Sequence, residues 1–429
     1  MSGDLISPFG RAAKAPLAGR TILQIVPPRA ARGDEPGTLA IAVALVETGA
    51  RALVASDSMG LASEVQAVGG LHIPFPASSD NPFAMALNAR RLARVLESER
   101  VDLVHARSRA LAWVALRACR KLKAPLVTAI LGEGPAAKPR STFEAAVGEG
   151  DFVIVSSQSA ADRAAEIFPA AVRRLRIVRP GFELASFAPD AVSRQRVAKA
   201  REGWGAAPHE RVVLAPGSLA PSRGQKLVVE AAALLRGKGL DLRFMLAGEA
   251  AKPAVARELD ALAEARGVKA MVARTGATAD PAAAFVASSV AVFAAREPEG
   301  VGRAAIEAAA IGALTVIAEV GNAREIVLAP PDGPAEERTG WIVPPDDATA
   351  LAAALESALT LGASAREAIR RRSRMRIAGL YSLERMKRDM LGVYADALQG
   401  RGDWWFRWGT AGARSRCIGW RSFSLRGSF

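Results

Sequence analysis

Short runs of apolar, mostly β-branched residues alternate along the chain with longer alanine- and leucine-rich stretches. Five such runs lie in the first half of the sequence: TILQIV (21–26), RALVAS (51–56), VDLVHA (101–106), PLVTAI (125–130) and DFVIVS (151–156). Their length predicts strands, whereas the stretches between them, such as LAIAVALVETG (39–49) and NARRLARVLESER (88–100), predict helices. Strands that alternate with helices indicate a parallel sheet covered on both faces.

A second series of such runs follows: RVVLAPG (211–217), LRFMLAG (242–248), VARTG (272–276), VAVFAA (290–295) and LTVIAE (314–319). The chain has 429 residues, too many for one ordinary core but suited to two domains of about 150 to 200 residues. We therefore predict an α/β protein with two Rossmann-like, doubly wound domains. The predicted segments are an extension (1–19), a first domain (20–190), a linker rich in proline, glycine and charge (191–208), a second domain (209–380), a terminal helix (381–399) and a basic, tryptophan-rich tail (400–429).

The net charge of +14 at pH 7 narrows the classes of partner. Residues 401–429 hold six arginines and one aspartate, a net +5. No zinc-finger, helix-turn-helix or aromatic RNA-binding motif is present, which argues against nucleic acid and leaves phosphorylated substrates or a membrane surface. Cys119 and Cys417 form no metal-binding pattern. No apolar run approaches the roughly 20 residues of a membrane span and no clear leader begins the chain, so we expect a cytoplasmic protein.

The segment REPEGVGRAAIEAAAIG (296–312) places a glycine-rich loop between a predicted strand and a predicted helix. Ligands of open parallel sheets bind beyond the carboxyl ends of the strands, where exposed amides at a helix start hold anions. Arg303 adds a cation, so the loop predicts a diphosphate site. Glu307 is placed to accept hydrogen bonds from sugar hydroxyls, and Glu299 faces the other end of the ligand. The alternative is that Glu307 only complements the helix dipole and Glu299 is a solvated loop acid.

From about Arg20 to Leu398 the order of motifs resembles glycosyltransferase family 4. The likeness is carried by IVRPGFELASFAP, VVLAPGSLAPSRGQKLVVEAA, LRFMLAGE, EPEGVGRAAIEAAAIG and TGWIVPPDDATALAAAL. The segments VDLVHARSRALAWVAL and NPFAMALNARRLARVL are similar in particular to bacterial lipopolysaccharide-core mannosyltransferases. The resemblance implies retaining transfer and the GT-B fold, in which two Rossmann-like domains face each other across a cleft.

The resemblance also implies roles for the donor site. Glu299 contacts the donor sugar and Arg223 the phosphates, and Glu307 holds the ribose. The other implied donor-binding residues are Gly300, Val301, Gly302, Arg303, Gly217, Ser218 and Lys226. Ser218 stands where the family has an arginine, and Arg303 or Lys226 could replace that charge. The implied donor is GDP-mannose, and no metal is expected because no Asp-x-Asp pair lies in a suitable loop.

The first domain departs further from the family pattern. Leu131 precedes Gly132 where the family commonly has a histidine that contacts the donor sugar. The acceptor loop RGDEPGT keeps Gly33 and Glu35 but has Pro36 in place of an arginine, which removes an amide and fixes the backbone. Further candidate acceptor contacts follow the strand VDLVHA: His105, Arg107 and Arg109. The alternative for His105 is that its ring, at the end of the strand, only makes hydrogen bonds to the backbone. The alternative for Arg107 and Arg109 is that they are a solvated pair in the loop.

Two functions from different classes fit these patterns. The first is an enzyme that moves a hexose, with mannose preferred, from a nucleoside diphosphate to a lipopolysaccharide-core or related envelope glycan at the cytoplasmic membrane face. The second is a degenerate relative that keeps the fold and acts as a binding or scaffold protein, as the changes at Leu131, Ser218 and Pro36 favour. A nucleotide-sugar epimerase of the same fold fits the motif order less well. The aromatic and basic tail is expected either to contact anionic lipid peripherally or to be disordered.

Overall fold

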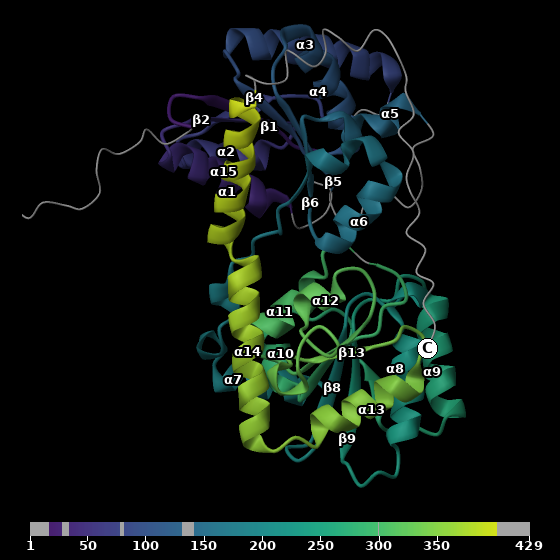
Figure 1. Ribbon diagram of the computed structural model, residues 1–429. Coiled ribbons are helices and arrows are strands. Elements are labelled where there is room, and N and C mark those ends of the chain that lie inside the picture. The colour runs from purple at the N-terminus through teal and green to yellow at the C-terminus, as the bar shows by residue number, and fades with distance from the viewer. Residues whose placement is uncertain (1–16, 28–33, 78–80, 131–140, 299, 401–429) are drawn as a thin grey trace, which may run out of the picture.

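The computed structural model describes residues 17–27, 34–77, 81–130, 141–298 and 300–400. They form two α/β lobes stacked one above the other, with the amino-terminal lobe at the top of Figure 1. Each lobe contains one parallel sheet flanked by helices. The predicted fold class, two doubly wound domains, is therefore confirmed.

The amino-terminal sheet has seven strands in the order β3-β2-β1-β4-β5-β6-β7. The strands are β1 (Thr21–Ile25), β2 (Arg51–Ser56), β3 (Leu71–Pro74), β4 (Leu103–Ala106), β5 (Leu126–Ile130), β6 (Phe152–Val155) and β7 (Leu175–Ile177). The helices of this lobe are α1 (Asp34–Glu47), α2 (Met59–Ala67), α3 (Pro82–Ser98), α4 (Arg109–Leu122), α5 (Thr142–Ala145) and α6 (Gln158–Ile167). The strand order reverses between β1 and β4, where doubly wound sheets bind their ligands.

The carboxyl-terminal sheet has six strands in the order β10-β9-β8-β11-β12-β13. The strands are β8 (Arg211–Pro216), β9 (Leu242–Ala247), β10 (Val272–Arg274), β11 (Val290–Phe293), β12 (Thr315–Ala318) and β13 (Trp341–Val343). The helices around it are α7 (Arg194–Gly203), α8 (Gln225–Leu235), α9 (Pro253–Ala265), α10 (Pro281–Ala287), α11 (Arg303–Ile311), α12 (Ala323–Ile326) and α13 (Ala348–Leu359). Here the order reverses between β8 and β11, which places the expected ligand position beside the glycine-rich loop.

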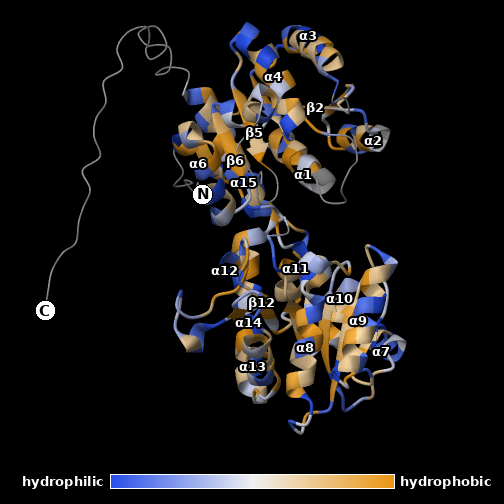
Figure 2. Cartoon of the chain, turned by 90° about the vertical axis from the view of Figure 1, so that its right-hand side faces the viewer, coloured by the Kyte–Doolittle hydropathy of each residue, from blue (hydrophilic) through white to orange (hydrophobic). Residues whose placement is uncertain are grey.

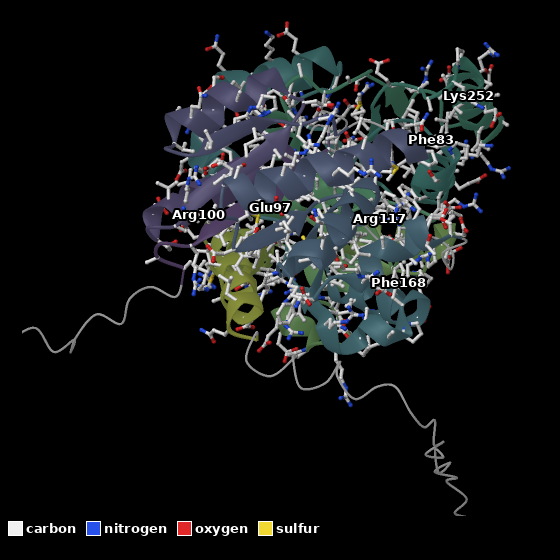
Figure 3. All side chains as sticks on the ribbon, turned by 90° about the horizontal axis from the view of Figure 1, so that it is seen from above. Phe83, Glu97, Arg100, Arg117, Phe168 and Lys252 are labelled. Atoms are coloured by element: carbon white, nitrogen blue, oxygen red, sulfur yellow. The ribbon has the colours of Figure 1, made fainter. Side chains whose placement is uncertain are left out.

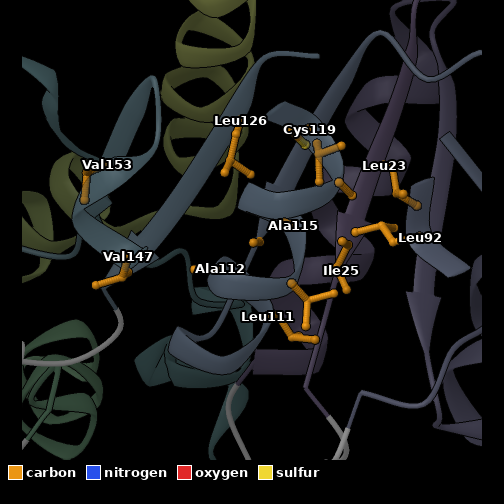
Figure 4. Close-up of a cluster of buried hydrophobic side chains, with 14 of the residues drawn as sticks. Leu23, Ile25, Leu92, Leu111, Ala112, Ala115, Cys119, Leu126, Val147 and Val153 are labelled. Atoms are coloured by element: carbon orange, nitrogen blue, oxygen red, sulfur yellow. The ribbon is translucent and has the colours of Figure 1, made fainter. Parts of the chain in front are cut away.

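In Figure 2 the orange, apolar segments lie on strands and helices of both lobes, and buried apolar clusters join each sheet to its helices. In the amino-terminal lobe, α4 buries Leu111, Ala115 and Cys119, which lie four residues apart and therefore on one side of the helix (Figure 4). Leu23 and Leu126 belong to the same cluster. Burial raises the pKa of the Cys119 thiol, so this cysteine acts as a small packing residue.

The segment predicted as a linker, 191–208, is instead part of the carboxyl-terminal lobe. It contains α7, whose first turn is capped by the hydroxyl of Ser193. Val197 and Ala200 pack against a buried cluster that includes Phe285 of α10. The few apolar residues of α7 are enough to dock it because they share one face of the helix.

The chain returns to the amino-terminal lobe through α14 (Ala363–Tyr381) and α15 (Leu383–Gln399), the long helices at the left of Figure 1. α15 packs against α1 of the amino-terminal lobe. The chain crosses between the lobes twice, after β7 near Phe182 and at the junction of α14 and α15. These two crossings lie side by side, because the amide of Phe182 donates to the carbonyl of Tyr381 at 2.9 Å. Among the described residues no single helix is long and apolar enough to cross a bilayer; α13 and α14 pass that test only together, as a pair bent by 110°.

Candidate active site

A cavity of about 270 Å³ lies at the carboxyl edge of the carboxyl-terminal sheet. The ends of β8 and β9 and the helices α10 and α11 form its walls, which are mostly apolar. The polar side chains on its lining are Ser218, Glu249, Thr278 and Glu307. A larger cavity of about 690 Å³ lies between α4, α15 and the amino ends of β5 and β6, and no residue of the predicted site lines it. Apolar walls with a few convergent polar groups are typical of a site that binds a small molecule. We therefore take the smaller cavity as the candidate ligand-binding site.

The loop after β8 is held in place by close packing and by one buried amide. Gly224 has φ 70°, and a Cβ there would lie 1.8 Å from the carbonyl oxygen of Ala294, so only glycine fits. The Gln225 side chain is buried and donates from Nε2 to the Ser218 carbonyl at 3.0 Å. The backbone of this loop is therefore fixed at the edge of the cavity.

Arg223 and Lys226 follow this loop but point to different places. A guanidinium nitrogen of Arg223 lies 3.6 Å from the position that a Cβ on Gly217 would occupy, so the cation sits over the loop. Lys226 is exposed, and its Nζ lies 2.7 Å from Glu258 of α9. The prediction that Lys226 contributes a donor-binding charge is therefore corrected: one position along α8 from the inward-facing Gln225, it faces away from the cavity.

The segment after β12 packs against the start of α11. Gly302 has φ 67°, and a Cβ would lie 2.9 Å from Ile326 and 3.2 Å from Asn322. Asn322 is buried and donates from Nδ2 to the Val301 carbonyl at 3.0 Å. These contacts therefore hold Val301 and Gly302 at the start of the helix, where backbone amides can bind an anion. Glu299 lies outside the described residues.

Glu307 and Arg303 form a pair one helical turn apart on α11. Glu307 Oε1 accepts from Arg303 Nε at 2.7 Å. The Glu307 side chain is only 10% exposed and lines the cavity, whereas that of Arg303 is 51% exposed. The Arg303 guanidinium carbon also lies 5.8 Å from the ring centre of Phe182, in the crossing between the lobes. The Glu307 carboxylate therefore lies on the cavity wall with Oε1 paired to Arg303.

In the amino-terminal lobe, His105 is interior rather than part of an open acceptor site. The residue is 1% exposed, and its Nδ1 lies 2.7 Å from the hydroxyl of Tyr394 in α15. Burial, together with the charge of Arg107, lowers the pKa of His105 well below 6.5. The expected acceptor contact, and the alternative of a histidine satisfied by the backbone, are both replaced by an internal contact to α15.

Arg107 and Arg109 follow β4, as predicted, but differ in exposure. Arg107 is buried beside the start of α1 and donates to the hydroxyl of Thr38 at 2.6 Å. Arg109 is exposed as the first residue of α4, after the capping Ser108. Some residues of the predicted acceptor and sugar sites lie outside the described part of the chain: Gly33, Leu131, and the side chains of Glu35 and Pro36.

The neutral state of His105 predicts a pH-dependent stability. Below pH 6.5 the unfolded chain binds a proton at this residue that the folded protein does not bind. The free energy of unfolding should therefore fall by up to about 1.4 kcal/mol for each pH unit below 6.5. Urea unfolding between pH 7.5 and 5.0 measures this slope. The variant His105→Gln should show a shallower slope, and equal slopes would mean that His105 is not the group responsible.

Glu325 of α12 joins the two lobes. Its Oε1 accepts from the backbone amide of Gln158, at the start of α6, at 2.7 Å. Its Oε2 accepts from Arg179 Nε at 3.0 Å and Nη2 at 2.5 Å. The side chains of Arg179 and Glu325 are 20% and 15% exposed. One carboxylate of the carboxyl-terminal lobe thus holds two groups of the amino-terminal lobe.

Sequence reasoning missed several residues that shape the site: Gln225, Asn322, Glu325 and Tyr394. Asn322 and Glu325 follow the predicted strand 314–319, so the same rule that located Glu307 also pointed to them. Gln225 and Tyr394 carry no comparable local signal.

Two family models match the chain, and each covers one lobe. The Glycosyltransferase Family 4 model matches residues 33–186, and the model of glycosyl transferases group 1 matches residues 197–376. The boundary between them falls at the crossing from the first lobe to the second. Together they match most of the sequence.

Known proteins are similar to this chain in sequence or in fold. A D-inositol 3-phosphate glycosyltransferase of Jonesia denitrificans is 30% identical over 274 residues, which is 62% of this chain and 62% of that protein. The crystal structure of a glycosyltransferase from Rickettsia africae superposes with a TM-score of 0.77 at 25% identity, covering 89% of this chain and 99% of the other. HepE of Anabaena, solved in complex with UDP, shares the fold with a TM-score of 0.71 at 18% identity, covering 88% of this chain and 100% of the other.

Proposed function

We infer that this chain, which belongs to the GT-B glycosyltransferases through a family 4 domain followed by a group 1 domain, transfers a hexose from a nucleoside diphosphate to an acceptor on its amino-terminal lobe. The observation that carries the proposal is the 270 Å³ cavity with the nearly buried Glu307 on its wall. Nothing in the relatives favours the scaffold alternative.

The cavity suits the nucleoside part of the donor. Phe285 and Pro281 offer an apolar wall for a base, and Glu307 can accept hydrogen bonds from two ribose hydroxyls. The diphosphate then extends toward Arg223 and the loop that precedes Arg303. The UDP complex of the Anabaena neighbour supports a nucleotide sugar of this kind. We propose GDP-mannose as the first donor to test, from the motif likeness to mannosyltransferases.

The proposed chemistry breaks the bond between the anomeric carbon and the phosphate oxygen. The nucleoside diphosphate leaves with the electron pair, the acceptor oxygen forms the new bond to the anomeric carbon, and the acceptor proton passes to the leaving phosphate oxygen. Arg223 and the amides of residues 300–302 are assigned to the charge that develops on the phosphates. We propose that the anomeric configuration is retained and that Glu299 contacts the sugar, as the motif implies.

The acceptor is proposed to be anionic. Arg109 places an exposed cation at the carboxyl edge of the amino-terminal sheet, the side on which ligands bind, and Arg107 lies buried beside it. A phosphorylated envelope glycan of the lipopolysaccharide-core class fits the motif likeness. A soluble inositol phosphate is the competing source of the same charge, named from the Jonesia relative.

A screen of nucleotide sugars tests the proposal. A donor that binds only the folded protein raises the melting temperature in a concentration-dependent way. We expect this for GDP-mannose or for a UDP-hexose, followed by release of nucleoside diphosphate when a phosphorylated glycan or inositol phosphate is added. If no nucleoside diphosphate raises the melting temperature, the assignment of the cavity is wrong.

Arg223 and Lys226 lie next to the same loop, so the turnover of variants at these two positions can be compared. Arg223→Met should lower turnover by roughly a hundredfold to a thousandfold, because a charge aimed at the leaving phosphates is lost. Lys226→Met should stay near the wild-type rate, since Lys226 pairs with Glu258 outside the cavity. Steady-state release of nucleoside diphosphate measures both. A loss at Lys226 as large as that at Arg223 would contradict the placement of these side chains.

A further inference from the structure

The larger cavity, of about 690 Å³, lies at the edge of the amino-terminal sheet that is opposite to its ligand-binding edge. The end of α4, the starts of β5 and β6 and the end of α15 form its walls, together with the short turns η1 (Ala146–Glu149) and η2 (Pro169–Arg174). Cys119 of α4 and Leu126 of β5, which Figure 4 labels, lie on this wall. The cavity is therefore in a different lobe from the proposed donor site and away from the candidate acceptor residues.

The walls of this cavity are mostly apolar. Phe152 contributes an aromatic ring, and the guanidinium carbon of Arg176 lies 4.4 Å from the centre of that ring. Besides Cys119 and Leu126, the other apolar residues of the wall are Leu116, Ala124, Pro125, Ala170 and Ala397. A cavity of this size and character is typical of a site that takes an apolar or aromatic occupant.

The charges on the wall cancel, which narrows the chemistry of the occupant. Three basic and three acidic residues line the cavity: Arg120, Lys123, Arg174, Glu149, Asp151 and Asp396. Glu149 is paired with Arg120 at 3.1 Å, whereas Asp151 accepts from the backbone amide of Leu126 at 2.8 Å. Neither Asp151 nor Asp396 forms an ion pair in the part of the chain that the structure describes. A nucleotide or another strongly anionic ligand is therefore disfavoured, and an aromatic occupant with a cation nearby fits better.

The chain itself supplies such an occupant beside the cavity. Gly400, the last described residue, lines the cavity, and the sequence continues from there as RGDWWFRWGT (401–410). Trp404, Trp405 and Phe406 follow Gly400 by four to six residues. An extended segment of that length reaches roughly 13 to 22 Å, more than the roughly 11 Å across a sphere of the cavity's volume. The three aromatic residues can therefore enter the cavity without any movement of α15.

We propose that residues 404–406 of this same chain fill the 690 Å³ cavity and hold the end of α15 against the amino-terminal lobe. Docking removes from water both the apolar wall and a run of three aromatic side chains. Arg401 and Arg407, on either side of that run, come within reach of Asp396 and Asp151. The assignment does not depend on the proposed transfer reaction, and it gives the aromatic residues a partner other than the lipid expected from the sequence.

The docking completes the return of the chain to the amino-terminal lobe. After Tyr394, which contacts His105, α15 buries only the small side chain of Ala397. Aromatic residues directly after the helix supply the larger apolar contact that its last turn lacks, because the cavity lies between α15, β6 and η2. The expected consequence is a more stable amino-terminal lobe and an unchanged donor site in the other lobe.

Hydrogen exchange of the full chain tests the proposal. The amides of residues 404–408 should exchange at least about tenfold more slowly in the wild type than in Ala170→Trp, because the new side chain takes the space of the docked residues. Ala170 is an exposed residue of the cavity wall, two positions after Phe168, which Figure 3 labels. The matched control is Ala335→Trp. Ala335 is also exposed and starts a short turn, η6 (Ala335–Glu337), but it lines neither of the two cavities.

A variant of the tail gives a second, independent measurement. Trp404→Ser/Trp405→Ser/Phe406→Ser should lower the melting temperature by about 4 °C or more, because buried aromatic surface is lost. The same three changes should have no further effect in the Ala170→Trp protein, and the affinity for nucleoside diphosphate should not change.

Four results would overturn the proposal. The first is that the amides of residues 404–408 exchange as fast in the wild type as in a free peptide, and the second is that the serine variant melts like the wild type. The third is protection that appears only with vesicles of phosphatidylglycerol, which would assign the aromatic residues to lipid. The fourth is protection that rises with protein concentration, which would place them in the cavity of a second copy.

Discussion

Replacing Glu307 with glutamine is expected to weaken nucleoside diphosphate binding by roughly 1.5 to 3 kcal/mol, which is tenfold to more than a hundredfold. The Glu307 carboxylate is 10% exposed on the wall of the cavity and is paired with Arg303. Glutamine keeps the shape but replaces one charged acceptor by a donor, so one of the two proposed ribose contacts becomes unfavourable. Isothermal titration calorimetry with GDP and UDP measures the change.

The control is Glu367→Gln on α14. Glu367 also pairs with an arginine of its own helix, Arg374, at 3.1 Å, but it is exposed and lies away from the cavity. Its replacement should leave nucleotide affinity unchanged. Unchanged affinity in a folded Glu307→Gln protein would remove Glu307 from the donor site and with it the main support for the proposed function.

Most strands that the sequence predicts are buried along most of their length; β10, which is predicted from VARTG and has no buried residue, is the exception. β1 and β12 consist of apolar and threonine residues with one or no polar interruption, and every residue is buried. Three edge or near-edge strands were missed: β3, β7 and β13. They have three or four residues, and β7 is only partly buried, so their apolar pattern is too short to separate from that of a loop.

Helix α7 was missed for a related reason. Its sequence RQRVAKAREG is dominated by charge, and no residue of it is fully buried. Docking depends on two small apolar residues and on the ion pair of Arg196 with Asp280, at 2.7 Å. Tertiary contact of this kind decides the structure where local periodicity is weak.

For the site, the sequence is informative where function depends on backbone shape. The glycines at 224, 300 and 302 adopt the left-handed conformation, and their spacing in the sequence indicates the two loops of the donor site. The direction of Lys226 could not be predicted, because it depends on which side of α8 faces the cavity. The contact of His105 with Tyr394 spans 289 residues, and nothing local indicates such a pair.

The interlobe contact of Glu325 was also beyond the sequence, although its place after a strand was not. Its partners, Gln158 and Arg179, come from a helix start and from the crossing between the lobes. The two crossings are tightly packed, because a Cβ on Gly181 would lie 2.8 Å from the backbone of Leu383. The relative position of the lobes is therefore held by two adjacent crossings and by the Glu325 contact beside them, where Arg376 Nε of α14 also donates to the Glu325 carbonyl at 3.0 Å.

The substitution Glu325→Ala is therefore expected to weaken the contact between the lobes. It should lower kcat more than it lowers the affinity for the donor. The change leaves the Arg179 guanidinium and the Gln158 amide without their acceptor, and breaking a buried ion pair costs roughly 3 to 5 kcal/mol, less where the pair is 15 to 20% exposed as here. The cavity lies wholly in the carboxyl-terminal lobe, so the affinity for nucleoside diphosphate should change little. Transfer needs both lobes, so the loss should appear in kcat.

Small-angle scattering and steady-state kinetics together measure these effects. The radius of gyration should rise in Glu325→Ala and stay unchanged in Glu319→Ala, which removes an exposed acid that pairs with Arg324 within one lobe at 2.7 Å. Replacing both members of the contact, as Arg179→Met/Glu325→Met, should recover part of the lost stability, because no charge is then left unpaired. The kcat is informative because the proposed reaction brings a donor on one lobe to an acceptor on the other. If Glu325→Ala has the scattering and the kcat of the wild type, this carboxylate does not set the distance between the lobes.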